Sequence, residues 1–169
     1  MAVLKIRTYP DPVLRSKARE VTNIDGALQR LIDDMIETMY AAPGIGLAAN
    51  QAGVPQQILV IDINARQQAQ YPLITLLNPR IIASEGTTEG EEGCLSLPGF
   101  NAVIERAERV QVKGLNREGK EIKIEAAGLL AVALQHEIDH LHGKMILDKA
   151  GPLKKSLYKK RVLKKSHAG

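Results

Sequence analysis

The sequence predicts an α+β fold, a single domain in which antiparallel strands and hairpins pack around one central helix, followed by a basic C-terminal helix. Three observations support this prediction. Apolar residues recur with helical spacing over positions 24 to 41, short apolar and alternating segments fill positions 57 to 124, and an apolar segment of helical length spans positions 127 to 141. At 169 residues, the chain suits one compact domain that buries most of its apolar surface.

The N-terminal part predicts two helices. Residues 9 to 15 form a turn entering a short helix, with Pro12 near its start, where proline is tolerated. A longer amphipathic helix is expected over residues 24 to 41, because apolar side chains recur there at spacings of three and four. Pro43 and Gly44 end it. Its apolar face consists of Leu28, Leu31, Ile32, Met35, Ile36 and Met39.

Strands are expected between the two long helices. One uninterrupted apolar run comes first, and a polar, Gln-rich loop over residues 64 to 70 follows it. Further on, two alternating segments flank a turn at residues 116 to 119, which predicts a hairpin with one buried face. The expected strands cover residues 57–63, then 72–78 and 80–83 as one strand or two, then 110–113 and 121–124.

The central helix carries the motif H-E-x-x-H at residues 136 to 140. On a helix, imidazoles four residues apart lie on one face, about 40° apart, and can bind one ion. Glu137 lies about 100° round from His136, so its carboxylate can take a proton from a water on that ion without being a ligand. The motif therefore predicts a metal-binding helix. The alternative is a solvated polar stripe.

A third metal ligand must come from another part of the chain. Hydrolytic sites normally have three protein ligands and one open position. No Glu follows Glu137, His142 points about 200° away from the preceding histidine, and Ile146 stands where a longer form of the motif has a third histidine. Cys94 is the only cysteine and lies among glycines and a proline in residues 91–99. A lone cysteine is usually a small buried hydrophobe, but this setting favours a thiolate brought close to an ion.

The segment from 44 to 51, Gly-Ile-Gly-Leu-Ala-Ala-Asn-Gln, is rich in small residues. A phosphate-binding loop is one interpretation, but the segment follows a helix and lacks the third glycine of a dinucleotide-binding loop. The other is a backbone that runs beside a bound substrate, with the Gln51 amide at its end. On the central helix, an apolar wall lies beside the histidines. One interpretation is that it binds a hydrophobic substrate side chain, and the other is that it packs the core. The wall residues are Leu129, Val132 and Ala133.

The net charge of +4 is concentrated at the C-terminus. From Lys149 onward there are eight Lys or Arg and no Asp or Glu, whereas the preceding 148 residues carry 15 basic and 19 acidic side chains. This tail is either a solvated helix end or an electrostatic contact for RNA. No long apolar span and no signal-peptide pattern occur, so we expect a soluble, cytoplasmic protein with no membrane or DNA partner.

Three segments together resemble bacterial peptide deformylases. The family motifs are G-φ-G-φ-A-A-x-Q, E-G-C-φ-S and H-E-φ-D-H, where φ is apolar, and they occur in that order at residues 44–51, 92–96 and 136–140. The resemblance extends over about residues 1 to 150. It implies a metal-dependent hydrolase that removes the N-formyl group from the N-terminal formylmethionine of newly synthesised polypeptides and releases formate.

The resemblance also implies roles for residues of this chain. Glu137 would be the general base and later the acid, while the Gln51 amide and the Leu95 backbone N–H would stabilise the oxyanion. Fe²⁺ is the expected metal, with Zn²⁺, Ni²⁺ or Co²⁺ as replacements. The implied metal ligands are Cys94, His136 and His140, and the implied contacts of the extended peptide are Ile45, Gly46 and Gly93.

Under this interpretation, residues 1–150 form the catalytic domain and residues 151–169 form a basic helix or tail, which the resemblance links to the ribosome. Two other functions compete. A general metallopeptidase shares H-E-x-x-H, but the missing downstream ligand and the presence of Cys94 argue against it. A non-enzymatic RNA-binding protein would explain the tail and leave the three motifs unexplained.

Overall fold

The computed structural model describes residues 2–64 and 72–168, with side chains up to residue 165. Helices and antiparallel sheets occur together in one domain, which confirms the predicted α+β class. The expected loop over residues 64–70 lies, apart from Asn64, outside the described residues. The helical segments are η1 (Pro12–Arg15), α1 (Gly26–Ala41), η2 (Ala49–Ala52), α2 (Gly128–Leu141), α3 (Ile146–Lys149) and α4 (Pro152–Ala168).

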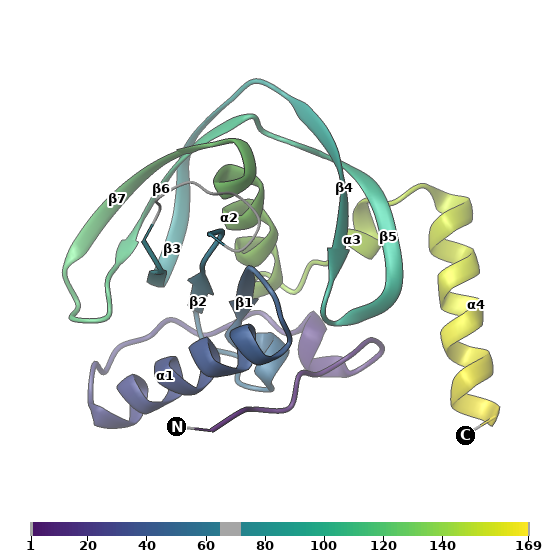
Figure 1. The fold of residues 1–169 in the computed structure, drawn as a ribbon, viewed down its shortest axis with the longest axis horizontal. Helices are drawn as coiled ribbons and strands as arrows, with labels where there is room; N and C mark the ends of the chain where they lie inside the picture. The colour runs from purple at the N-terminus through teal and green to yellow at the C-terminus, as the bar shows by residue number, and fades with distance from the viewer. Residues whose placement is uncertain (1, 65–71, 169) are drawn as a thin grey trace.

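Two antiparallel sheets form an arch over helix α2 (Figure 1). The larger sheet has the strand order β1-β2-β3-β6-β7, and the smaller one pairs β4 with β5. Figure 1 shows that β3 and β6 on one side continue across the top into β4 and β5 on the other. The strands are β1 (Gly46–Ala48), β2 (Ile58–Ile61), β3 (Ile74–Glu85), β4 (Thr88–Cys94), β5 (Leu97–Arg106), β6 (Arg109–Leu115) and β7 (Glu121–Ala127).

Strand β2 is buried on both faces, which explains why its sequence is apolar without alternation. Ile58 and Val60 pack into the cluster that contains helix α1, whereas Leu59 and Ile61 pack into the cluster that contains α2. Successive side chains of a strand point to opposite faces, so the sheet lies between the two helices at this strand. The core therefore fixes α2 against the middle of the sheet.

Both predicted long helices are confirmed, with small changes at their starts. Helix α1 begins at Gly26 because the Asp25 side chain accepts a hydrogen bond from the Leu28 backbone N–H and caps the helix. Met35 and Met39 are fully buried in its apolar face, as the spacing predicts. Helix α2 runs over Gly128–Leu141, and its apolar residues pack into the larger core cluster.

The hairpin of β4 and β5 was not predicted from the sequence. Strand β4 has the sequence Thr-Glu-Gly-Glu-Glu-Gly-Cys, which has no apolar alternation because most of the strand is exposed. Two smaller differences concern the other strands. The segments expected at 72–78 and 80–83 belong to one strand, β3 (Ile74–Glu85), which is irregular near Asn78, where φ is +51°. The small-residue segment forms strand β1 and helix η2.

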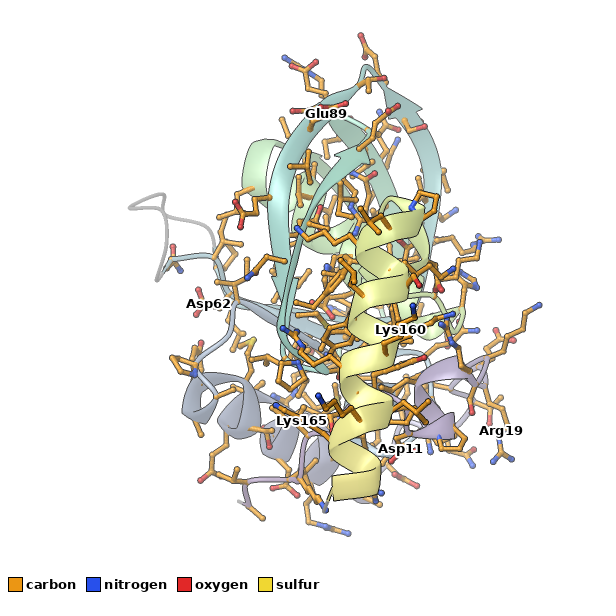
Figure 2. The ribbon with its side chains drawn as sticks, turned by 90° about the vertical axis from the view of Figure 1, so that its right-hand side faces the viewer. Asp11, Arg19, Asp62, Glu89, Lys160 and Lys165 are labelled. Carbon is orange, nitrogen blue, oxygen red and sulfur yellow. The ribbon has the colours of Figure 1, made fainter. Side chains whose placement is uncertain are left out.

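The basic tail forms helix α4, which packs against strand β5 (Figure 2). Tyr158 is the buried anchor of this contact, with its ring 4.9 Å from that of Phe100 and 6.1 Å from that of Tyr9. Its hydroxyl donates to the Pro98 carbonyl. Most of its lysines are exposed to solvent, although the Lys154 Nζ lies 5.9 Å from the centre of the Phe100 ring and Lys155 is half-buried. Among the described residues, no helix is long and apolar enough to cross a membrane.

Candidate metal centre and active site

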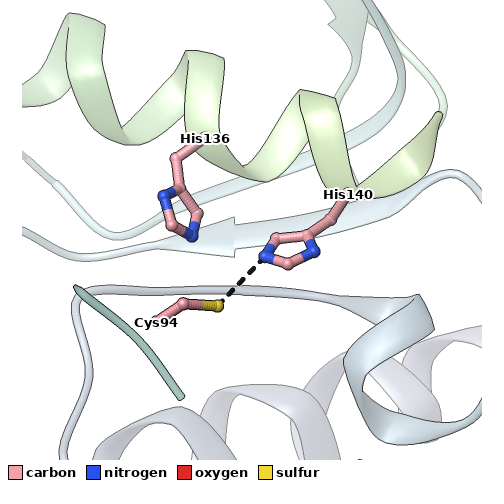
Figure 3. Close-up of side chains that lie close together, drawn as sticks. All are labelled: Cys94, His136 and His140. Carbon is pink, nitrogen blue, oxygen red and sulfur yellow. Dashed lines mark hydrogen bonds between the residues drawn. The ribbon is translucent and has the colours of Figure 1, made fainter. Parts of the chain in front are cut away.

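Three side chains from two distant parts of the chain converge on one point (Figure 3). Cys94 ends strand β4, and His136 and His140 project from successive turns of α2. Their ligand atoms all lie within 4.8 Å of one another, and the Cys94 Sγ is 3.3 Å from the His140 Nε2. Around a tetrahedral ion, such donors lie about 3.5 Å apart. The set therefore fits a single divalent cation and leaves a fourth position for water or substrate.

A buried charge network fixes His136. Its Nδ1 is 3.0 Å from the Glu92 carboxylate, so Nε2 is the nitrogen that faces the ligand cluster. Arg106 donates two hydrogen bonds of 2.9 Å to Glu92 and one of 2.7 Å to Asp139. The Arg106 side chain is only 3% exposed, and that of Glu92 only 9%. His136 is thus held by one network that joins β4, β5 and α2.

The protonation of Glu92 follows from these partners. Burial alone raises the pKa of its carboxyl group, but the hydrogen bonds with His136 and Arg106 and their charges outweigh burial and lower the pKa below its usual value. Glu92 is therefore a carboxylate at neutral pH. A carboxylate at Nδ1 favours the His136 tautomer whose Nε2 is free to bind a cation.

Glu137 lies beside the ligand cluster, 5% exposed, on the wall of a cavity. Burial raises the pKa of its carboxyl group to about 7, and the neighbouring His136 and Arg106 charges oppose that rise only in part. Among the described residues, its Oε1 has no hydrogen-bond partner. A Cβ atom on Gly46 would lie 2.5 Å from the Glu137 Oε2, so only glycine leaves room for this carboxylate.

The orientation of the Gln51 amide is set by its neighbours. Its Oε1 accepts a hydrogen bond from the Ala48 backbone N–H at 3.0 Å. Its Nε2 donates to the Ser96 hydroxyl at 3.1 Å and lies 3.6 Å from the Cys94 Sγ. The donor end of the amide therefore faces the ligand cluster. There it can donate to a negatively charged oxygen that develops near the cation.

The cavity has a volume of about 290 Å³, and almost every site residue predicted from the sequence lines it. His140 is the exception. It is only 1% exposed, and its Nε2 lies 3.3 Å from the Cys94 Sγ. Leu95 forms part of the turn between β4 and β5, and its side chain reaches Gly44. The predicted residues that line the cavity are Ile45, Gly46, Gln51, Gly93, Cys94, Leu95, Leu129, Val132, Ala133, His136 and Glu137.

Sequence reasoning missed the groups that support the ligands. Glu92 and Asp139 lie inside the second and third motifs, but no role was inferred for them. Arg106 left a clearer signal, because it continues the inward alternation of Phe100, Ala102 and Ile104 along β5. A charge at a core position of a strand requires buried partners of opposite sign, which Glu92 and Asp139 supply.

The fold and the site together define a metal-dependent hydrolase. Its donors are one thiolate and two imidazoles, a set that suits a transition-metal ion. A buried carboxylate and an amide donor line the same cavity, where they can move a proton and stabilise an oxyanion. This is the chemistry of hydrolysis at a carbonyl carbon.

Comparisons with known proteins give the family. Residues 3–156 match the family model described as polypeptide deformylase, and the chain belongs to that family. The peptide deformylase of Thermodesulfovibrio yellowstonii is 59% identical over 161 residues, which are 95% of this chain and 97% of that protein. A crystal structure of a peptide deformylase from Legionella pneumophila superimposes with a TM-score of 0.91 at 46% identity, over 99% of this chain and 97% of that one.

A second solved structure carries an inhibitor. The peptide deformylase of Ehrlichia chaffeensis in complex with actinonin superimposes with a TM-score of 0.90 at 40% identity. The match covers 98% of each chain. The similarity therefore includes both sheets, helix α2 and the basic helix α4.

Proposed function

We propose that this chain is a peptide deformylase, which hydrolyses the N-formyl group of the formylmethionine at the start of newly synthesised polypeptides. Water is consumed, the formyl C–N bond breaks, and formate and a free α-amino group are the products. The observation that carries the proposal is the convergence of Cys94, His136 and His140 beside the buried Glu137 carboxylate, in a chain of the polypeptide deformylase family.

The proton transfers are assigned to Glu137. A divalent cation held by the three ligands would polarise the formyl carbonyl and acidify water. Glu137 takes the proton of the attacking water at its carboxylate and then gives it to the nitrogen of the leaving amine. Burial supports this exchange, because a carboxyl group whose pKa is raised to about 7 both accepts and releases a proton readily at neutral pH.

The remaining residues bind and orient the substrate. The Gln51 Nε2 and the Leu95 backbone N–H are assigned to the oxyanion, and backbone groups of Ile45, Gly46 and Gly93 are assigned to the extended peptide. Strand β1 is an edge strand of its sheet, so a peptide can add beside it through backbone hydrogen bonds. The apolar wall of the cavity, formed by Leu129, Val132 and Ala133, suits the methionine side chain.

Fe²⁺ is the proposed metal in the cell, with Zn²⁺, Ni²⁺ or Co²⁺ able to take its place. The mixed thiolate and imidazole set tolerates all four ions, so metal supply decides which one is bound. Purification under anaerobic conditions, followed by metal analysis, is expected to give one Fe²⁺ per chain. Recovery of zinc alone under those conditions would contradict the assignment of iron.

The central experiment compares two substrates with the anaerobically purified protein. A formyl-Met peptide is expected to release formate, while the same peptide acetylated at its N-terminus is expected to stay intact at its internal bonds. Cleavage of internal bonds without formate release would instead indicate a general metallopeptidase. RNA binding without stoichiometric metal would indicate a non-enzymatic RNA-binding protein.

A ribosomal contact is proposed for the tail. We assign catalysis to residues 1–150 in the cytoplasm and electrostatic binding of ribosomal RNA to residues 151–169. The charge of α4 supports this assignment, because its lysines are exposed while Tyr158 holds the helix in place. Deletion of residues 152–169 should weaken binding to ribosomes, most visibly at low salt, and leave hydrolysis of a short formyl peptide intact. Equal ribosome binding by both chains would contradict the assignment.

A further inference from the structure

Asn50 is a buried side chain whose contacts belong to the metal site. It stands at the open x position of the first motif, next to Gln51, and is 0% exposed. Its Nδ2 donates two hydrogen bonds of 2.9 Å, one to the Ser16 carbonyl and one to the His140 carbonyl. One amide thus ties the segment after η1 and the metal-site end of α2 to the helix that carries Gln51.

The His140 carbonyl that accepts from Asn50 lies in the last turn of helix α2. The last four carbonyl groups of a helix have no partner within it, and His140 is the second-last residue of α2. Its carbonyl accepts from the Gly143 backbone N–H at 3.0 Å and from Asn50. Fraying of this turn would move the His140 imidazole, so the side chain of Asn50 holds a ligand as well as a helix end.

Asn50 and His140 each have one further buried polar atom. The Asn50 Oδ1 and the His140 Nδ1 are both inaccessible, and neither has a hydrogen-bond partner among the described residues. The His140 Nε2 faces the Cys94 thiol, so it is the nitrogen on the ligand side. An imidazole that binds a cation through Nε2 carries its proton on Nδ1, and that proton needs an acceptor.

We propose that Asn50 is a positioning residue for His140, and that one buried water accepts a hydrogen bond from the His140 Nδ1–H and donates one to the Asn50 Oδ1 when a cation is bound at Nε2. The Asn50 side chain already holds the backbone of His140 through the 2.9 Å hydrogen bond to its carbonyl, and the two unpartnered atoms are an acceptor and a donor that a single water can satisfy together. The inference rests on the proposed metal site. It explains why a polar side chain occupies a position with no exposure to solvent or to the cavity.

The test uses the full-length protein loaded with Zn²⁺, and it compares Asn50→Leu with Gln57→Leu. Leucine has nearly the shape of asparagine but offers no donor and no acceptor. Gln57 is the matched control, because its side-chain amide also holds a carbonyl of the N-terminal segment, that of Ala18 at 3.3 Å. Loss of zinc to a chelator is followed over time, together with the melting temperature of each metal-free protein.

We expect Asn50→Leu to lose zinc about 10- to 100-fold faster than the wild-type protein, the range typical of lost supporting hydrogen bonds around a metal. Gln57→Leu is expected to melt lower and lose zinc at the wild-type rate. In ¹⁵N spectra of the zinc-loaded wild type, the His140 Nδ1–H should exchange slowly with solvent, and in Asn50→Leu it should exchange faster. If Asn50→Leu does not fold, Asn50→Ser should show the same changes to a smaller degree.

Equal zinc loss from Asn50→Leu and wild type would overturn the inference, as would equal acceleration in both leucine variants, which would indicate general loosening. An unchanged exchange rate of the Nδ1–H would also overturn it. A wild-type protein that binds no zinc would instead overturn the proposed metal site itself, so the two failures are distinguishable.

Discussion

Helices α2 and α4 both carry or contact several ionisable side chains, but they hold them in opposite ways. Around α2, the ionisable groups are buried, and a network of hydrogen bonds sets the position of His136 through Glu92 and Arg106. On α4, most lysines are exposed, and the helix is held mainly by the contacts of the Tyr158 ring with Phe100 and Tyr9. Chemistry at one atom requires fixed geometry, whereas electrostatic attraction requires only charge on a surface. Substitutions near α2 should therefore have far larger effects.

The largest effect is expected for Glu137→Ala. We assign this side chain the roles of base and then acid, so turnover of a formyl-Met peptide should fall about 10⁴-fold, at the upper end of what acid–base groups contribute. Zinc content should remain one per chain, because Glu137 is not among the proposed ligands. Glu108→Ala, which removes an exposed carboxylate, is the control and should match the wild type. Comparable turnover by Glu137→Ala would remove this residue as the base.

The second prediction concerns the network that supports α2. Arg106→Met leaves the Glu92 carboxylate buried without its bidentate partner, which should cost about 3–5 kcal/mol of unfolding free energy. Chemical denaturation at pH 7 measures this loss. Lys113→Met is the control, since it breaks an ion pair that is largely exposed and should cost less than about 1 kcal/mol. Equal losses in the two variants would show that burial of the network has no energetic consequence.

The ion pair of Arg106 and Glu92 also predicts how the destabilisation caused by Arg106→Met depends on pH. The folded-state pKa of Glu92 is lowered, so the pair stabilises the wild type above the unfolded-state value, about 4.3, and that stabilisation is lost as pH falls through the lower folded-state pKa. In Arg106→Met, burial without the guanidinium should raise the pKa of Glu92. The difference in stability between the two proteins should therefore be large at pH 7 and shrink toward pH 3. A difference independent of pH would contradict this account.

The third prediction separates binding of the metal from stabilisation of the oxyanion. Gln51→Ala should lower turnover about 100-fold, which corresponds to one lost oxyanion donor. Its zinc content should not change, since the amide donates to the site and is not a ligand. Ser96→Ala is the matched control, because it removes the other partner of the Gln51 Nε2 and leaves the donor itself. Near-normal turnover in Gln51→Ala would refute the assigned role.

How far the sequence predicts this molecule depends on whether the relevant geometry is local. The spacing of His136 and His140 predicts their common helix face, because helix periodicity is a local property. The approach of Cys94 to that face depends on the β4 and β5 hairpin, whose first strand has no apolar alternation. The sequence identified Cys94 as a ligand candidate, but the roles of Glu92 and Arg106, which orient His136 opposite that thiol, follow from tertiary contacts.

The smallest effect on turnover is expected for Tyr158→Ala, which removes the anchor of α4. Without that ring, the contacts with Phe100 and Tyr9 are lost, and the lysines of α4 should be cut faster by trypsin. Turnover of a short formyl peptide should stay at the wild-type level, because none of the described side chains of α4 lines the cavity. Tyr158→Phe keeps the ring contacts and loses only the hydrogen bond to Pro98, so its trypsin sensitivity should remain close to that of the wild type.

A fall in turnover with Tyr158→Ala would change the comparison between the two helices. Strand β5 lies between them, since Phe100 on β5 contacts Tyr158, while β5 pairs with the strand that ends at Cys94. Movement of α4 could then reach the thiol through the hairpin. In that case zinc would also be lost faster, and α4 would count among the elements that position the metal. Unchanged turnover with faster proteolysis would show that the surface helix and the metal helix are independent.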